Sequence, residues 1–313
     1  MPNPQPRARL PSSDFGRGRL DALEEQGTHL LREAAGCFER PAILFSGGKD
    51  SLCILRMAEK AFGRGAIPFR LLMIDTGHNF PEVLAARDRR SAELGAELSV
   101  RSVEASIARG SVRLARPDEP RNPHQSTTLL EAVAELGLDA LVGGARRDEE
   151  KARAKERLFS HRESHGQWRP RRQRPEMWDL FNTRARPGEH FRVFPISNWT
   201  ELDVWRYVER EGMELPSIYY AHERDVVVGR SGLLRPVTDL TPAAPGEEVA
   251  RLSVRFRTVG DVTCTCPVES RARNASEVVE ETLRAEVSER GATRMDDMAS
   301  EASMERRKLE GYF

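Results

Sequence analysis

The chain has 313 residues and a formal net charge of zero, from 49 basic and 49 acidic residues. A chain of this length can bury a substantial core, which favours one large domain with a smaller appendage. The even charge excludes a global basic field that would wrap nucleic acid, so any attraction for anions has to come from a local cluster.

The first predicted elements are a tail, a helix and a strand. Residues 1–18 are rich in Pro, Arg, Ser and Gly, which predicts a flexible tail. Residues 20–38 have the apolar spacing of an amphipathic helix. The apolar run 41–45 is typical of a buried strand, and residues 52–62 return to helical spacing. A strand is therefore followed directly by a turn and a helix.

The turn between this strand and helix carries candidate chemistry. It consists of Ser46, Gly47, Gly48, Lys49, Asp50 and Ser51, six residues named the phosphate turn. Backbone N–H groups in such a turn can converge on one point, and the start of the helix adds partial positive charge there. Together with two hydroxyls and a lysine, they predict a site for a phosphate or pyrophosphate. An ordinary steric turn would need the glycines but neither the serines nor the lysine.

The phosphate turn is not the common P-loop, which needs a glycine at the position of Ile43 and Ser or Thr at the position of Asp50. It resembles the PP-loop of ATP pyrophosphatases instead. That resemblance implies that the turn holds the β- and γ-phosphates of ATP, and that the bond between the α- and β-phosphates is cleaved.

Two further strands are predicted over 69–77 and 97–103, with a helix beginning at Pro81 between them. A helix over 127–136 and a strand over 138–142 follow. Strands that alternate with helices predict the α/β class, with a parallel twisted sheet and helices on both faces. The PP-loop resemblance implies the adenine nucleotide alpha hydrolase-like form of this architecture.

In such a sheet, ligands bind at the carboxyl ends of the strands, near the point where strand order reverses. Three strand ends carry polar residues, at 46–51, 75–79 and 143–148, and we expect them to form one crevice. Asp75 is a candidate for the ribose hydroxyls or a magnesium-bound water, and equally for a simple turn. Asp50 is the better candidate for Mg²⁺, because it lies beside the predicted phosphate site.

A basic cluster follows the fourth predicted strand. Residues 146–157 contain six basic and four acidic residues and are expected to begin a helix. The segment lacks a clear apolar stripe, and arginine forks match tetrahedral oxyanions bidentately. We expect it to hold a phosphate-sized anion beside ATP, the alternative being a solvated helix with internal pairs such as Glu149 with Arg153. The candidate ligands are Arg146, Arg147, Lys151 and Arg153.

The C-terminal half is predicted to be less regular. Residues 162–175 form a basic, proline-containing loop, and Thr200 is expected to cap a short helix. A linker at 240–249 precedes a strand over 252–257 and a helix over 275–290. The tryptophans expected to anchor the core or an interface are Trp168, Trp178, Trp199 and Trp205. The predicted organisation is a flexible tail over 1–18, a nucleotide-binding domain over 19–240 and a C-terminal partner-binding region over 241–313.

The cysteines and the hydropathy indicate a reducing, cytoplasmic setting. Cys264 and Cys266 are too close for a relaxed disulfide, and none of the four cysteines forms a C-x-x-C pair for zinc or redox chemistry. No apolar run approaches about 18 residues and the N-terminus has no hydrophobic signal core, so we expect no membrane contact. The even charge and the absence of a recognisable RNA module predict no nucleic-acid partner.

Several blocks together resemble one family, the small catalytic subunit of bacterial heterodimeric sulfate adenylyltransferase. The similarity runs from about residue 20 to the C-terminus. Besides the phosphate turn, it is carried by residues 75–77, 143–157, 173–178, 192–205, 254–259 and 306–313. Gly47 departs from many members of the family, which carry isoleucine there, and moves the turn towards the general PP-loop consensus.

The family implies that ATP and sulfate give adenosine 5′-phosphosulfate and pyrophosphate, a step of sulfate assimilation and cysteine biosynthesis, with Mg²⁺ present. It also implies a GTPase large subunit as partner, which this chain cannot replace because it has no Walker A motif. The phosphate turn would hold the departing pyrophosphate, and the basic cluster would hold sulfate and the α-phosphate. Sulfate is already ionised at neutral pH, so no general base is needed.

Three other functions are compatible with parts of this pattern. A phosphosulfate reductase of related fold needs a nucleophilic cysteine near its C-terminus, and no cysteine follows Cys266 here. A tRNA-modifying PP-loop pyrophosphatase would contact RNA through residues 162–174, with binding that falls steeply with salt. A regulatory nucleotide-binding subunit would not be catalytic.

Overall fold

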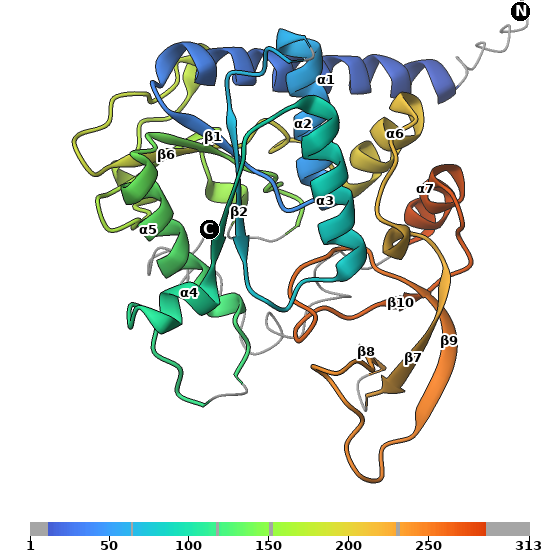
Figure 1. Ribbon diagram of the computed structural model, residues 1–313. Helices are drawn as coiled ribbons and strands as arrows, with labels where there is room; N and C mark the ends of the chain where they lie inside the picture. The colour runs from blue at the N-terminus through green and yellow to red at the C-terminus, as the bar shows by residue number, and fades with distance from the viewer. Residues whose placement is uncertain (1–11, 64, 117–118, 150–152, 230–231, 286–313) are drawn as a thin grey trace, which may run out of the picture.

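The computed structural model describes residues 12–63, 65–116, 119–149, 153–229 and 232–285. Figure 1 shows a larger α/β layer with a smaller sheet beside it. The larger layer contains α1 (Ser12–Cys37), β1 (Pro41–Leu44), α2 (Lys49–Phe62), β2 (Arg70–Asp75), α3 (Pro81–Leu94), β3 (Leu98–Ser102), α4 (Val103–Ala108), α5 (Gln125–Leu136), β4 (Ala140–Val142), β5 (Phe159–Arg162), β6 (His190–Val193) and α6 (Glu201–Glu211). The smaller sheet contains β7 (His222–Val228), β8 (Leu234–Pro236), β9 (Val249–Arg255) and β10 (Val268–Glu269), and α7 (Ala275–Arg284) follows it.

The larger sheet has the strand order β3-β2-β1-β4-β6-β5. Its neighbouring strands are parallel, except that β5 runs antiparallel to β6 at one edge. From β1 the chain builds β2 and β3 on one side and then returns to place β4 on the other, so the strand order reverses between β1 and β4. The predicted α/β class is therefore confirmed.

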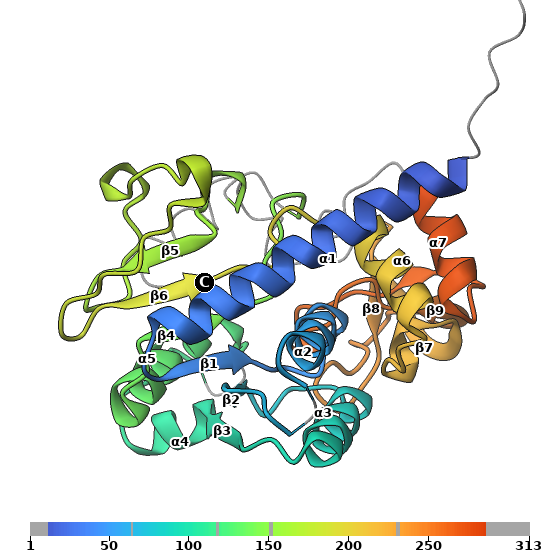
Figure 2. The same cartoon turned by 90° about the horizontal axis from the view of Figure 1, so that it is seen from above.

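Alternate residues of β1 face opposite layers of the core. Ile43 packs in a cluster with side chains of α1, α2 and α6, whereas Ala42 packs in a cluster with side chains of α4 and α5. Helices therefore cover both faces of the sheet, as the continuous apolar run of this strand predicts. Figure 2 shows α1 running across the molecule over β1 towards α6.

Local sequence signals account for several helix ends. Pro81 takes the first helical position of α3, as predicted. Thr200 caps α6 in a capping box with Asp203, which confirms the predicted cap. Gly95 and Gly212 end α3 and α6 in the left-handed conformation that glycine adopts without strain.

The smaller sheet is antiparallel, with strand order β10-β9-β7-β8. After β9 the chain returns to the larger layer. Phe256 N donates to Ile218 O at 2.8 Å, and Asn79 forms an antiparallel bridge with Asp261. Residues 258–261 therefore lie near the turn that follows β2, at the strand-end edge of the larger sheet.

The start of α1 corrects the expected tail. The helix begins at Ser12, so a flexible tail is wrong for residues 12–18, and residues 1–11 lie outside the described part. Tertiary contact supports the longer helix, because the Arg19 guanidinium binds both carboxylate oxygens of Asp203 at 2.8 and 3.1 Å. Local propensity does not predict this, because the stretch contains two glycines, which disfavour a helix interior.

The domain boundary expected at residue 240 divides a single sheet. Strands β7 and β8 precede it, β9 and β10 follow it, and β7 pairs with β9 along its length. The linker at 240–249 is predicted from local composition. Local composition does not reveal which distant strands pair with each other. Residues 286–313 lie outside the described part, so the partner-binding role of the C-terminal region stays a prediction.

The helix expected after β4 is not formed by its described residues, 143–149 and 153–157. Residues 147–149 make a turn, and Arg153–Lys155 makes a single 3-10 turn. The reason is burial: the Arg146 side chain is fully buried and paired with carboxylates, which holds this backbone against the core. A solvated helix would have left that side chain in water.

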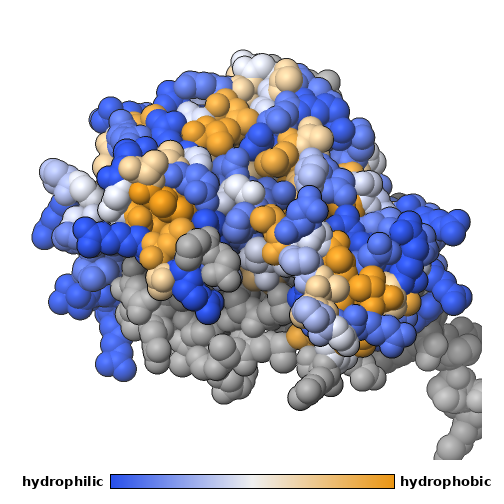
Figure 3. Space-filling view, turned by 60° about the horizontal axis from the view of Figure 1, so that its bottom comes forward, coloured by the Kyte–Doolittle hydropathy of each residue, from blue (hydrophilic) through white to orange (hydrophobic). Residues whose placement is uncertain are grey.

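The surface is mostly hydrophilic, in line with a charged fraction of 31%. On the face shown in Figure 3, apolar side chains form separate patches rather than one continuous area. No helix in the described ranges has both the length and the apolar character needed to cross a bilayer.

His190 on β6 gives the fold a measurable dependence on pH. The residue is buried, and neither ring nitrogen has a hydrogen-bond partner among the described residues. Burial, followed by the positive charges of Arg192 and Arg162, lowers the pKa of His190 to about 2. The folded protein therefore keeps this imidazole neutral where the unfolded chain takes up a proton.

We expect the free energy of unfolding to fall as the pH drops below about 6.5, where the unfolded chain begins to protonate His190. This group alone contributes a slope of up to about 1.4 kcal/mol per pH unit. Urea unfolding of wild type and His190→Phe between about pH 8 and pH 5 checks the expectation, because phenylalanine does not titrate. Identical pH slopes in the two proteins would contradict it.

Candidate functional site

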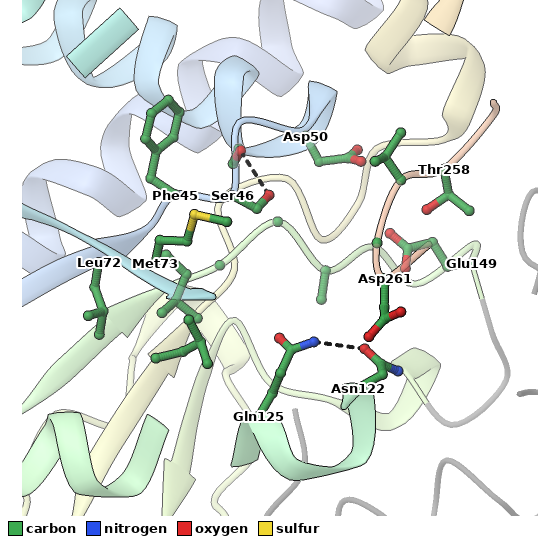
Figure 4. A pocket seen from close by; sticks show the side chains of 18 of the residues that line it. Phe45, Ser46, Asp50, Leu72, Met73, Asn122, Gln125, Glu149, Thr258 and Asp261 are labelled. Atoms are coloured by element: carbon green, nitrogen blue, oxygen red, sulfur yellow. Dashed lines mark hydrogen bonds between the residues drawn. The ribbon is translucent and has the colours of Figure 1, made fainter. Parts of the chain in front are cut away.

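A cavity of about 290 Å³ lies at the carboxyl ends of the strands, where the strand order reverses. Residues 44–46, 72–74 and 143–145 line it at the ends of β1, β2 and β4, and residues 258–261 line it from the C-terminal region. Figure 4 shows side chains from these segments arranged around a common space. Its volume is near the lower end of the roughly 300–1,000 Å³ typical of small-molecule sites.

The phosphate turn is held in place by its own hydroxyl groups. Gly48 N donates to Ser46 Oγ at 3.3 Å, and Ser51 Oγ donates to Gly48 O at 2.9 Å. The two hydroxyl oxygens lie 3.4 Å apart (Figure 4). Gly47 has φ +79°, and a Cβ there would lie 2.6 Å from Val83 O. In this structure, both the backbone conformation and the packing therefore favour glycine at position 47.

Asp50 binds the two positive groups that the sequence placed on different loops. Lys49 Nζ lies 2.9 Å from Asp50 Oδ2, and Arg146 Nη1 donates to Asp50 Oδ1. Both cationic side chains are fully buried, whereas the Asp50 side chain is 23% exposed and lines the cavity. A Cβ at Gly144 would lie 2.9 Å from Asp50 Cβ, so only glycine allows this approach. The phosphate turn and residues 143–157, named the basic loop, therefore meet in one crevice.

The basic loop places its arginines in different roles. Arg146 also lies 3.2 Å from Asp148 and 3.5 Å from Glu149, so carboxylates surround it. Arg147 donates to Asn198 Oδ1 and to a backbone carbonyl, and is not among the residues that line the cavity. Arg153 does line the cavity, where it pairs with Glu149. Lys151 lies outside the described residues.

Asp75 ends β2 but turns towards its own loop. Its Oδ1 accepts hydrogen bonds from Gly77 N and Asn79 Nδ2, both at 2.7 Å. The Asp75 side chain therefore closes a turn, in agreement with the simple turn that the sequence also allows. Asn79, and not Asp75, is among the residues that line the cavity. A role for Asp75 at the ribose stays a prediction.

Several cavity residues had no signal in the sequence. Asn122 and Gln125 precede or begin α5, and Gln125 Nε2 donates to Asn122 Oδ1 at 2.7 Å (Figure 4). Asp261 is buried, with its Oδ2 3.5 Å from His78 Nδ1. Arg192 lies within one of the blocks that carry the family resemblance, but nothing in the local sequence marks it as a cavity residue. Only the tertiary structure brings these four side chains to the cavity.

One wall of the cavity is apolar. Leu44, Leu72, Ile74 and Phe194 contribute to it from the strand ends. Leu72 and Met73 lie on the opposite side of the view in Figure 4 from Asp261 and Glu149. A ligand with one flat apolar part and one charged part matches this division.

Magnesium has limited carboxylate support here. Both oxygens of Asp50 are engaged, by Lys49 and by Arg146. No group of three or more metal-binding side chains is found among the described residues. The donor set therefore does not fit a resident ion, and suits at most Mg²⁺ that arrives with phosphate oxygens.

The family model for the phosphoadenosine phosphosulfate reductase domain matches residues 40–267. Sulfate adenylyltransferase subunit 2 of Streptomyces lavendulae is 56% identical over 298 residues, covering 95% of this chain and 93% of that protein. The protein of the same name from Mycolicibacterium vanbaalenii is also 56% identical, over 94% of each chain. That of Mycobacterium tuberculosis is 54% identical over 94% of each chain.

Among solved structures, phosphoadenylyl-sulfate reductase from Candida auris is 18% identical with a TM-score of 0.42, covering 67% of this chain and 92% of that one. FMN adenylyltransferase from Candida glabrata in complex with ATP is 13% identical with a TM-score of 0.45, covering 68% and 62%.

Replacement of Gly47 tests the geometry of the phosphate turn, and Gly63 offers a matched control. Both residues have positive φ, +79° and +86°, but a Cβ at Gly63 meets nothing within 4 Å. We expect Gly63→Ala to lower the free energy of unfolding by about 1 kcal/mol from backbone strain alone. Gly47→Ala should lower it more, and should weaken pyrophosphate binding.

Urea unfolding and calorimetric titration with pyrophosphate measure the two effects. If Gly47→Ala and Gly63→Ala behave alike in both measurements, the close packing of the turn against Val83 has no consequence for the site.

Proposed function

The chain belongs to the family of sulfate adenylyltransferase subunit 2, and we propose that it transfers the adenylyl group of ATP to sulfate. The products are adenosine 5′-phosphosulfate and pyrophosphate. The observation that carries the proposal is the cavity at the reversal of strand order, which the phosphate turn and the basic loop line together. Two anions that must react with each other can be held in one such space.

ATP fits the division of the cavity. The apolar wall at Leu44, Leu72 and Ile74 suits the adenine ring, and the phosphate turn suits the β- and γ-phosphates. The α-phosphate then lies between these two regions, near the backbone of residues 143–145. In this arrangement the bond to be broken lies between the phosphate turn and the basic loop.

Arg153 and Arg192 are the best-placed side chains for sulfate. Both line the cavity, and Arg192 is almost completely buried. Burial and the charge of Arg162 lower the pKa of Arg192 to about 9, which leaves it positively charged at neutral pH. A guanidinium in a water-poor site is a strong and oriented partner for a tetrahedral dianion.

The reaction needs positioning and charge neutralisation rather than proton transfer. A sulfate oxygen attacks the α-phosphorus, the bond from that phosphorus to the oxygen bridging to the β-phosphorus breaks, and pyrophosphate leaves with the electron pair. Sulfate is ionised at neutral pH, so no base has to remove a proton. The protein contributes oriented donors and positive charge, as in other phosphoryl transfers.

Asp50 links the phosphate turn to this chemistry. Its carboxylate pairs with both Lys49 and Arg146, and a more highly charged triphosphate at the turn would compete with it for these cations. Binding of ATP would then release a carboxylate beside the phosphates. A carboxylate in that position can bind the Mg²⁺ that accompanies ATP, which reconciles the predicted roles of Lys49 and Asp50.

A second subunit belongs to the proposal. The relatives are named subunit 2, and we infer that GTP hydrolysis on a large partner subunit drives the unfavourable adenylyl transfer to sulfate. The assembly would serve sulfate assimilation towards cysteine in the cytoplasm. The sequence agrees with a separate GTPase, because it contains no Walker A motif.

Sulfate-dependent exchange of labelled pyrophosphate into ATP tests the proposed function. We expect exchange only when sulfate and Mg²⁺ are both present, because label returns to ATP through adenosine 5′-phosphosulfate. Sulfite release that depends on thioredoxin would indicate a reductase instead. ATP cleavage that depends on tRNA would indicate an RNA-modifying enzyme, and ATP binding with no exchange would indicate a regulatory subunit.

Lys49→Ala should reduce the exchange rate by roughly 10²–10³-fold, as for the loss of one donor to a developing negative charge. Lys60→Ala is the matched control, because Lys60 lies on the same helix and pairs with Glu24 and Glu211 away from the cavity. The control should keep its rate within about twofold. Unchanged exchange in folded Lys49→Ala would remove this lysine from the mechanism.

A further inference from the structure

The segment between β5 and β6 exposes three large apolar side chains in succession. Met177 is 55% exposed, Trp178 is 82% exposed and Leu180 is 54% exposed. The chain's three other tryptophans are buried, as predicted for core anchors. Residues 177–180 are named the Trp178 loop. An exposed cluster of this composition is typical of a contact surface rather than of a water-facing loop.

The backbone of the Trp178 loop is held in an unusual conformation. Trp178 and Asp179 both have φ of 55°, and they are the only non-glycine residues with positive φ in the described part of the chain. Bulky L-residues disfavour this region, so such a conformation persists only where the surroundings impose it. The loop is therefore held in this form by its neighbours.

Contacts on both sides of the loop provide that support. Before it, the Glu176 carboxylate accepts hydrogen bonds from Leu158 N and Phe159 N, both at 2.7 Å. After it, Phe181 stacks on Phe159 with ring centroids 4.6 Å apart. Arg174 donates to the carbonyl oxygen of Leu180 at 3.0 Å. The two ends are anchored to β5 while the apolar side chains between them face outwards.

The surrounding sequence is strongly basic. Residues 157–186 contain eight arginines and only three carboxylates, although the whole chain has no net charge. Arg162 is buried and pairs with Glu156, whereas the other seven are at least partly exposed and are named the arginine rim: Arg157, Arg169, Arg171, Arg172, Arg174, Arg184 and Arg186. A complementary surface would therefore combine an apolar pocket with a rim of carboxylates.

Protein is the better match than RNA for this combination. Single-stranded RNA binds on aromatic platforms and a basic groove, and Met177 and Leu180 offer no ring for a base to stack on. A tryptophan flanked by aliphatic side chains and arginines has the composition of a protein–protein hot spot. The names of the relatives, subunit 2, imply that a protein partner exists.

We propose that the Trp178 loop and its arginine rim bind the other subunit of the enzyme, which presents an apolar pocket edged by carboxylates. This inference rests on the proposed function and names the surface through which the two subunits meet. The surface is also connected to the active site. Glu176, which directly precedes the Trp178 loop, accepts hydrogen bonds from Leu158 N and Phe159 N, and these two residues directly follow the basic loop that lines the cavity.

The test measures the affinity of the full-length chain for subunit 1 from the same organism, by titration calorimetry or biosensor. Trp178→Ala should weaken binding by at least about 30-fold, as for a hot-spot tryptophan. Val228→Ala is the matched control, because Val228 is an apolar side chain that is 55% exposed on β7 of the smaller sheet. The affinity of this variant for subunit 1 should equal that of wild type. Arg171→Glu should slow association, most clearly at low salt.

Urea unfolding shows whether Trp178→Ala is folded. If it is not, the affinity of Leu180→Ser for subunit 1 tests the same surface. If both folded variants bind subunit 1 with wild-type affinity, the proposed surface is wrong. Sulfate-dependent exchange would in that case still support the proposed function. Loss of tRNA binding in the variants, with subunit 1 affinity unchanged, would also overturn it in favour of an RNA contact. A wild-type chain that showed neither exchange nor binding to subunit 1 would contradict the proposed function itself.

Discussion

The ion pairs of Asp50 with Lys49 and Arg146 are the interaction on which the site depends. They connect the turn after β1 with the loop after β4, across the reversal of strand order. Two buried cations on neighbouring loops would repel each other without this carboxylate, and a buried charge that loses its partner is strongly destabilising. Glycine at position 144 is part of the same constraint, since any larger residue would push the loops apart. The geometry of the cavity follows from this contact.

The C-terminal region lines part of the cavity at the strand ends rather than forming a separate appendage. The smaller sheet returns residues 258–261 to the edge of the larger one, where Asn79 bridges Asp261. The turn after β2 is therefore braced from outside by this bridge, and from within by the hydrogen bonds that Asp75 accepts. Residues from the smaller sheet's part of the chain and strand ends of the larger sheet therefore line the cavity together.

Arginine has three different physical roles in this chain. Arg146 is buried among carboxylates and holds two loops together, whereas Arg153 and Arg192 bring positive charge to the cavity. The exposed arginines around the Trp178 loop form a basic surface that is distant in sequence from the phosphate turn. The net charge of zero does not reveal these three roles. Electrostatic effects in this chain act through local clusters that differ in their degree of burial.

The sequence by itself determined the strand–turn–helix unit at the phosphate turn, the alternating α/β pattern, the start of α3 at Pro81 and the cap of α6 at Thr200. Each of these depends on residues within a few positions of one another, through apolar spacing, capping and turn conformation. The basic loop was expected to be helical, and its true form depends on Arg146 binding Asp50, which is 96 residues away. Likewise, Asp261 and Asn122 reach the cavity, and β7 pairs with β9, only because distant segments of the chain meet. Those features belong to the tertiary structure because burial and ion pairing are set by neighbours in space, which local sequence patterns do not specify.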